Sequence, residues 1–253
     1  MRAVGFATPI VCHVLLVECA DQLMLIDTGF GNEDIRDPKG RIGAPRFLLR
    51  PALSVRETAI AQVAELGLDP KDVRTILLTH ADVDHIGGLT DFPWAEVYLH
   101  AQELQSFASP RVWSDKNRYR PAGWLKERGV HAVTLSSQTA WQGLDAALPL
   151  AGRDDVVMVS LPGHSAGHAG IALRQGDGWL LHAGDSFYSE QEIVGSDEPL
   201  PRMTRWMQRA VATDMRALKH TQSQLRALRA SLGDSLEIVN AHDSALFERF
   251  AAR

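Results

Sequence analysis

A run of six residues, His80-Ala81-Asp82-Val83-Asp84-His85, holds four side chains that can bind a metal. It follows the apolar stretch 75–79, where a buried strand is expected to end in a loop. On extended backbone, side chains alternate with a period of two, so His80, Asp82 and Asp84 would project to one side. Burying four polar side chains without partners would cost free energy. The run therefore predicts a metal centre.

Three further strand-like runs also end in a candidate ligand. Residues 156–161 lead to His164, residues 179–181 to Asp185, and residues 236–239 to His242. Strand ends at one edge of a layered fold converge, which is a common way to assemble a site. One histidine alone would be weak evidence for a metal site, but candidate ligands at the ends of four strands are strong evidence.

The donors number seven, which exceeds the three or four protein ligands of a single zinc site. Two metals sharing a carboxylate would use all seven. Imidazole and carboxylate without thiolate suit zinc, iron, manganese or cobalt. The full set is His80, Asp82, Asp84, His85, His164, Asp185 and His242.

The elements that must position these residues can be predicted in part. Residues 10–18 and 22–26 indicate a hairpin that ends in Asp27-Thr28-Gly29. Ser54 and Glu57 have the spacing of a capping box, which with Gly67 predicts a helix over about 55–66. Residues 32–53 indicate a long irregular loop, and 203–231 a helical region.

The segment 110–130 combines aromatic residues with Arg118 and other cations. It is either a packed surface excursion or a lid or wall over the site, and both interpretations stay open.

The whole chain reads as one α/β domain over residues 1–253, because no internal repeat or linker stands out. A formal net charge of −5 gives no reason to expect nucleic acid or a membrane as partner. Apolar runs are far shorter than the roughly 20 residues of a membrane span. Two cysteines, Cys12 and Cys19, make no disulfide framework, and no clear signal peptide precedes them, so we expect a cytoplasmic protein.

In these motifs the chain resembles the metallo-β-lactamase superfamily, whose loop reads H-x-H-x-D-H. The resemblance includes Asp27-Thr28-Gly29, the stretch 162–168 and Gly184-Asp185, and it extends over most of the chain. It implies a four-layer αββα sandwich with the metals at one edge of the two sheets.

The resemblance also implies ligand roles. His80, Asp82 and His164 would bind the first metal, Asp84, His85 and His242 the second, and Asp185 would bridge them. A water or hydroxide between two metals would then be the nucleophile, and the metals would polarise the scissile carbonyl.

Asp82 departs from the pattern, since a histidine is usual there. A carboxylate is harder and adds negative charge, which favours harder metals. Flavodiiron proteins, a redox branch, also carry an acidic residue at this position. Asp82 is either a true ligand in a hydrolase of altered metal preference, or it leaves the first site weak, with one metal on Asp84, His85, Asp185 and His242.

Tyr188 lies three residues after Asp185, a spacing shared with the acyl-homoserine-lactone lactonases. There the tyrosine helps to polarise the substrate carbonyl, although Tyr188 could simply pack below the loop. The candidate catalytic residues are Asp84 and Tyr188. His168 and Asp27 are expected to orient ligands by hydrogen bonding.

We expect a metal-dependent hydrolase that opens a lactone or another small ester, working as a monomer or homodimer. Its cofactors would be two divalent ions, zinc first, with manganese or iron open because of Asp82. A glyoxalase-II-like thioesterase is the nearest rival, and an iron-dependent redox enzyme or a non-catalytic binding module ranks lower.

Overall fold

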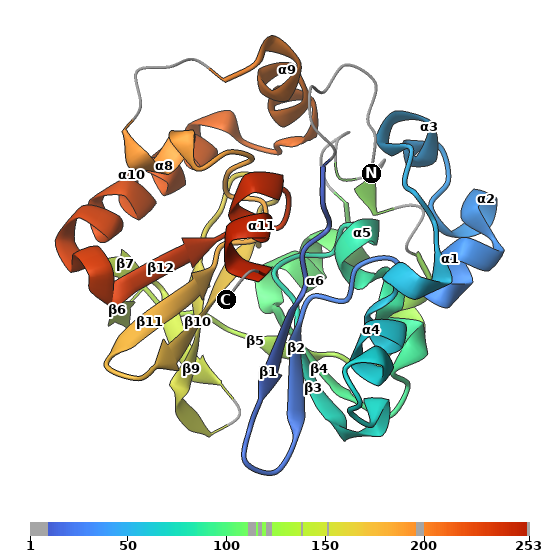
Figure 1. Cartoon of the computed structure of the whole chain (residues 1–253). Coiled ribbons are helices and arrows are strands. Elements are labelled where there is room, and N and C mark those ends of the chain that lie inside the picture. The colour runs from blue at the N-terminus through green and yellow to red at the C-terminus, as the bar shows by residue number, and fades with distance from the viewer. Residues whose placement is uncertain are drawn as a thin grey trace.

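Two five-stranded sheets face each other in the computed structural model, and helices cover their outer faces (Figure 1). The structure describes residues 10–110, 115, 118–119, 123–137, 139–150, 152–195 and 200–251. Among the helices of these residues, none combines the length and apolar character needed to cross a membrane.

The first sheet has the strand order β1-β2-β3-β4-β5. Its strands are β1 (Leu15–Glu18), β2 (Leu23–Ile26), β3 (Val73–Leu77), β4 (Glu96–His100) and β5 (His131–Val133). The expected hairpin is present as the antiparallel pair β1 and β2, although its first strand starts only at Leu15. From β2 to β5 all pairs are parallel, so the ends of β2 and β3 emerge at the same edge.

The second sheet has the order β12-β11-β10-β9-β8, and only β11 and β12 are parallel. Its strands are β8 (Ala147–Leu150), β9 (Arg153–Ser160), β10 (Ala169–Gln175), β11 (Gly178–His182) and β12 (Leu236–Val239). A small hairpin of β6 (Ala140–Trp141) and β7 (Leu144–Asp145) precedes β8.

Three apolar clusters correspond to the three interfaces of a four-layer sandwich. Met24 and Ile26 of β2 pack with residues of the second sheet such as Met158, in the layer between the sheets. Leu25, which points the other way, packs in the outer layer of the first sheet, as alternation along a strand requires. A third cluster joins the second sheet to its covering helices. The expected αββα architecture is therefore present.

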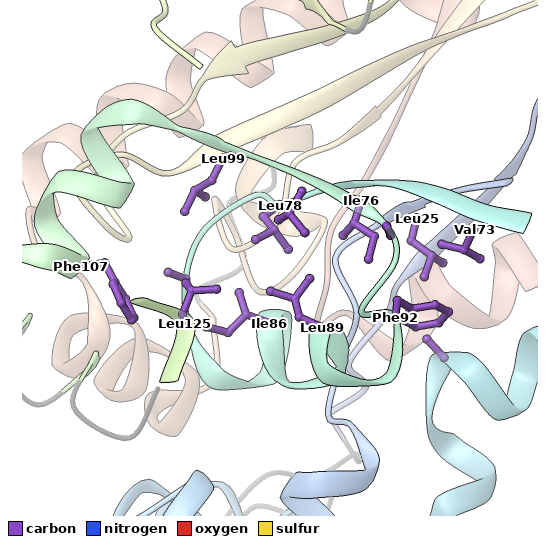
Figure 2. Packing of buried hydrophobic residues seen from close by; sticks show 14 of the residues in the cluster. Leu25, Val73, Ile76, Leu78, Ile86, Leu89, Phe92, Leu99, Phe107 and Leu125 are labelled. Carbon is purple, nitrogen blue, oxygen red and sulfur yellow. The ribbon is translucent and has the colours of Figure 1, made fainter. Parts of the chain in front are cut away.

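The helices over the first sheet are α4 (Ala59–Glu65), α5 (Val83–Ile86) and α6 (Ala101–Ala108), with the 3-10 turns η3 (Gly87–Asp91) and η4 (Gly123–Glu127). Figure 2 shows Ile86, Leu89 and Phe92 beneath the strand residues Leu25 and Ile76. The second sheet is covered by α8 (Gln191–Val194), α10 (Met215–Leu232) and α11 (Ser244–Ala251), while α9 (Arg202–Val211) precedes α10.

Three expectations about elements were wrong in detail. Residues 32–53 contain α1 (Asn32–Arg36), α2 (Pro38–Arg41) and α3 (Pro45–Leu49). The helical region 203–231 is two helices, because Asp214 caps a new helix by accepting from the backbone N–H of Arg216 and Ala217. The capping box at Ser54 does not form: residues 55–57 make the 3-10 turn η1, and Thr58 caps α4 instead.

Candidate metal centre

The strand ends bring all seven candidate ligands to one edge of the sandwich. His80 and Asp82 follow β3, His164 follows β9, Asp185 follows β11, and His242 follows β12. The extended backbone ends at Asp82, because α5 begins at Val83. Asp84 and His85 therefore reach the site from a helical turn, and the predicted alternation through Asp84 was wrong.

The first group of donors is His80, Asp82 and His164. Asp82 Oδ2 lies 3.0 Å from His164 Nε2 and 3.4 Å from His80 Nε2. Three donor atoms this close can hold one metal ion between them.

Asp185 lies between the donor groups. Its Oδ2 is 3.5 Å from His164 Nε2 and 3.1 Å from His242 Nε2, and its Oδ1 is 3.2 Å from His85 Nε2. Asp84 Oδ2 lies 3.8 Å from His242 Nε2. Asp185 thus contacts donors expected for both metals, which suits a bridging carboxylate.

Hydrogen bonds fix the orientation of three imidazoles. His242 Nδ1 donates to the carbonyl of Val11 at 2.7 Å, and His85 Nδ1 lies 2.8 Å from Asp27 Oδ2. Thr79 Oγ1 donates to Asp27, so it can accept from His80 Nδ1, which lies 2.9 Å away. With Nδ1 used in this way, each ring presents Nε2 to the site.

Asp27 orients the candidate ligand His85, as expected. The backbone of Asp27 is strained. Its φ is +59°, in the left-handed region that few residues other than glycine adopt. The carboxylate also accepts from the backbone N–H of Thr79 at 2.8 Å. Strain retained at such a position is a frequent property of functional sites.

The buried atoms of the site fit a metal. His80 Nε2, His85 Nε2 and Asp185 Oδ1 are buried and make no aligned hydrogen bond within the described part of the chain. They lie within 4.8 Å of one another. Buried polar groups without partners are costly, and a cation would satisfy all three.

Charge is distributed unevenly over the histidines. Burial, and after it the Arg118 guanidinium, lowers the pKa of His164 to about 4, so this ring is neutral. Burial also acts to lower the pKa of His85 and His242, but Asp185 outweighs it and raises both well above the ordinary value. A metal ion would replace protons on these two rings.

Tyr188 lies at the site rather than below the loop. Its hydroxyl donates to Asp185 Oδ2 at 3.0 Å, and its ring stacks on His242 with centroids 5.4 Å apart. Burial, together with Asp185, raises its pKa well above 10, so the phenol keeps its proton as a donor.

His168 makes a hydrogen bond with the candidate ligand Asp185, as expected, and the bond is to its backbone. Its Nδ1 donates to the carbonyl of Leu161, and its Nε2 accepts from the backbone N–H of Asp185 at 2.9 Å. It thereby fixes the loop that carries Asp185. His182 is the last residue of β11.

Sequence reasoning did not assign two residues that contact the cluster. Arg118 lies 2.9 Å from Asp82 Oδ1, through its Nε. The Cys12 thiol lies 3.6 Å from Asp84 Oδ2, close enough to His242 to share a cation with both. Both join segments distant in sequence, so no local spacing could have shown them.

A buried carboxylate supports the site from the side of the segment 110–130. Glu103 accepts from the Tyr119 hydroxyl at 2.8 Å, from Ser165 Oγ at 2.7 Å, and from the backbone N–H of Ala81 at 3.1 Å. The contacts of Arg118 and Tyr119 favour the interpretation of this segment as a wall of the site. Residues 111–114, 116–117 and 120–122 lie outside the described residues.

The layered fold and the cluster of imidazoles and carboxylates at one edge define a metallo-hydrolase type of protein. A sequence model of the metallo-β-lactamase superfamily matches residues 7–242, and the chain belongs to that superfamily.

Individual sequence relatives agree with this assignment, and a solved structure shows a similar fold. A "Probable metallo-hydrolase" of Mycobacterium tuberculosis is 39% identical over 254 residues, covering 98% of this chain and 79% of the relative. The N-acyl homoserine lactonase AttM of Azorhizobium caulinodans is 28% identical over 68% of this chain and 65% of its own length. The solved structure of AidC, a dizinc quorum-quenching lactonase, superposes with a TM-score of 0.61 at 15% identity, covering 93% of this chain and 73% of AidC.

Proposed function

We propose that the protein is a dinuclear metal-dependent hydrolase that opens a lactone or another small ester. The observation that carries this proposal is the convergence of His80, His85 and His164 Nε2 atoms with Asp185, among unsatisfied buried donor atoms. In this proposal His80, Asp82 and His164 hold one ion, Asp84, His85 and His242 hold the other, and Asp185 bridges.

Two bound divalent ions would lower the pKa of water enough to supply hydroxide near neutral pH, and would polarise the substrate carbonyl. The protein's own groups then orient the reaction. Asp27, Thr79 and the Val11 carbonyl hold the imidazoles in place. The Tyr188 hydroxyl is positioned to donate a hydrogen bond to a substrate oxygen, which stabilises charge that develops on it.

A cavity beside the site supports a substrate with an apolar part. Cys12, which contacts Asp84, also lines a cavity of about 420 Å³ whose other walls include Val14, Phe30, Leu53 and Phe247. The names of the relative AttM and of the structurally similar AidC, both lactonases, support an ester-type substrate.

The free thiols of Cys12 and Cys19 support the further proposal of a reducing compartment, the cytoplasm. We also propose that the described layers form one domain.

The test is a panel of lactones, simple esters, thioesters and phosphodiesters, assayed with zinc-, manganese- and iron-loaded protein. We expect metal-dependent turnover, fastest with lactones or simple esters, and none after chelation. Preference for thioesters would support the glyoxalase-II-like alternative. Absence of hydrolysis in every metal form, together with oxygen consumption in the iron form, would contradict the proposal.

A further inference from the structure

The Arg118 side chain is buried against the first donor group. Only 7% of it is exposed, and its Nε lies 2.9 Å from Asp82 Oδ1. Its Nη1 donates to the carbonyl of His164 at 2.7 Å, and its Nη2 to the carbonyl of Val211 at the end of α9. Arg118 therefore contacts one candidate ligand through its carboxylate and another through its backbone.

The two oxygens of Asp82 face different charged or polar groups. Oδ1 faces the guanidinium, while Oδ2 faces the Nε2 atoms of His164 and His80. A carboxylate held in this way presents one donor atom to a metal, as an imidazole does. Arginine suits this role because its planar guanidinium stays charged when buried.

The charge of the cluster supports the same interpretation. Asp82, Asp84 and Asp185 make three carboxylates, one more than the H-x-H-x-D-H pattern with its bridging aspartate supplies. The Arg118 guanidinium, which is buried beside Asp82 and lies 2.9 Å from its Oδ1, carries the opposite charge. Arg118 thus offsets the charge that the third carboxylate adds.

We propose that Arg118 is the positioning and charge-compensating partner of Asp82, so that the Asp82–Arg118 pair presents to the first metal a single oxygen donor with the net charge of a neutral histidine. This inference rests on the two-metal site of the proposed function. It changes the expectation from sequence: the donor at position 82 is harder than nitrogen, but the first site gains no net negative charge.

The test is a cycle of substitutions read by metal binding rather than by turnover. The variants are Asp82→His, Asp82→His/Arg118→Met and Asp82→His/Arg118→Lys. The metal-free proteins are titrated with Zn²⁺ against a competing chelator to obtain two stepwise Kd values. Visible absorption of the Co²⁺ forms reports the coordination of each ion. Circular dichroism confirms that each variant is folded.

We expect Asp82→His alone to weaken the first site by about tenfold to a hundredfold, because it leaves the buried Arg118 cation beside the metal. Adding Arg118→Met should recover at least tenfold, whereas adding Arg118→Lys, which keeps the charge, should not. Lysine keeps the charge and can still donate to the carbonyls of His164 and Val211, whereas methionine does neither. Recovery of zinc binding with methionine but not with lysine would therefore come from removal of the charge and not from retained loop contacts.

A purely structural Arg118 would give a different result. If it only anchors the loops, Arg118→Met would weaken zinc binding further in the Asp82→His protein, and the inference would be overturned. Equal effects of Met and Lys at position 118 would overturn it as well. A single zinc equivalent in the unsubstituted protein would instead contradict the two-metal proposal itself.

Discussion

At the scale of single residues, the direction of each imidazole is set by a partner outside the donor cluster. The Val11 carbonyl can only accept, so it requires the proton of His242 on Nδ1. Asp27 performs the same function for His85 and, through Thr79, for His80. Loss of such a partner leaves the ligand present but free to rotate, which weakens metal binding.

Asp27→Asn is expected to lower metal affinity by about 10- to 100-fold, because an amide cannot accept from both Thr79 and His85 as the carboxylate does. Asparagine tolerates a left-handed backbone, so the fold at φ +59° should be retained. Stepwise zinc titration measures the change. Unchanged zinc affinity would show that Asp27 stabilises only the turn and does not orient a ligand.

Tyr188→Phe should lower kcat by about 100-fold while leaving two bound metal equivalents, since it removes one hydrogen-bond donor next to Asp185. Kinetics on metal-loaded protein, paired with metal analysis, make the comparison. Loss of metal in the Tyr188→Phe protein would assign Tyr188 to positioning of Asp185 instead.

At the scale of elements, Thr58 caps α4, whereas Ser54 of the predicted capping box does not. Thr58 accepts from the backbone N–H of Ala61 and donates to the Val55 carbonyl. Thr58→Ala should lower the free energy of unfolding by about 1 kcal/mol. Ser54→Ala, the matched control, should change it by less than about 0.5 kcal/mol. Urea denaturation distinguishes the two, and equal losses would contradict the assignment.

His182 at the end of β11 makes stability depend on pH. Burial lowers its pKa to about 4, below the value of about 6.5 in the unfolded chain. The unfolded state therefore binds the proton first, so stability is full above pH 6.5 and is lost as the pH falls toward 4. At pH 5 the loss from this residue is about 2 kcal/mol.

The measurement compares urea unfolding of the unsubstituted protein and His182→Asn, both metal-free, at pH 7.5 and pH 5. Asparagine keeps an acceptor for the backbone N–H of Gly184, which His182 now binds. The variant should lose about 2 kcal/mol less between the two pH values. Parallel losses in both proteins would show that other groups dominate.

Part of the secondary structure and part of the candidate site could be predicted from the sequence. The bounds of β12 were predicted, because it is an apolar run with clear ends. The prediction of an irregular loop at residues 32–53 was wrong, because α1, α2 and α3 are too short to show helical periodicity in the sequence. The convergence of the seven candidate donors could be predicted, because each lies in a loop or turn that comes after a strand. Arg118 and Cys12 could not be predicted, because they meet the site only through tertiary contacts across 36 and 72 residues.

At the scale of the whole molecule, two sheets face each other so that the ends of β3, β9, β11 and β12 meet at one edge. The core between the sheets fixes their separation, and the outer helices cover the apolar outer face of each sheet. The site therefore depends on both sheets, since His80 follows a strand of one and His164, Asp185 and His242 follow strands of the other.

The proposed function requires that this edge of the sandwich holds two metal ions. Anomalous diffraction at the zinc absorption edge, on crystals of the zinc-loaded protein, would locate them. We predict two peaks about 3.5–4 Å apart, one among His80, Asp82 and His164, the other among Asp84, His85 and His242, with Asp185 touching both. A single peak would rule out two metal ions, and a first-site peak with Asp82 turned away from it would rule out Asp82 as a ligand.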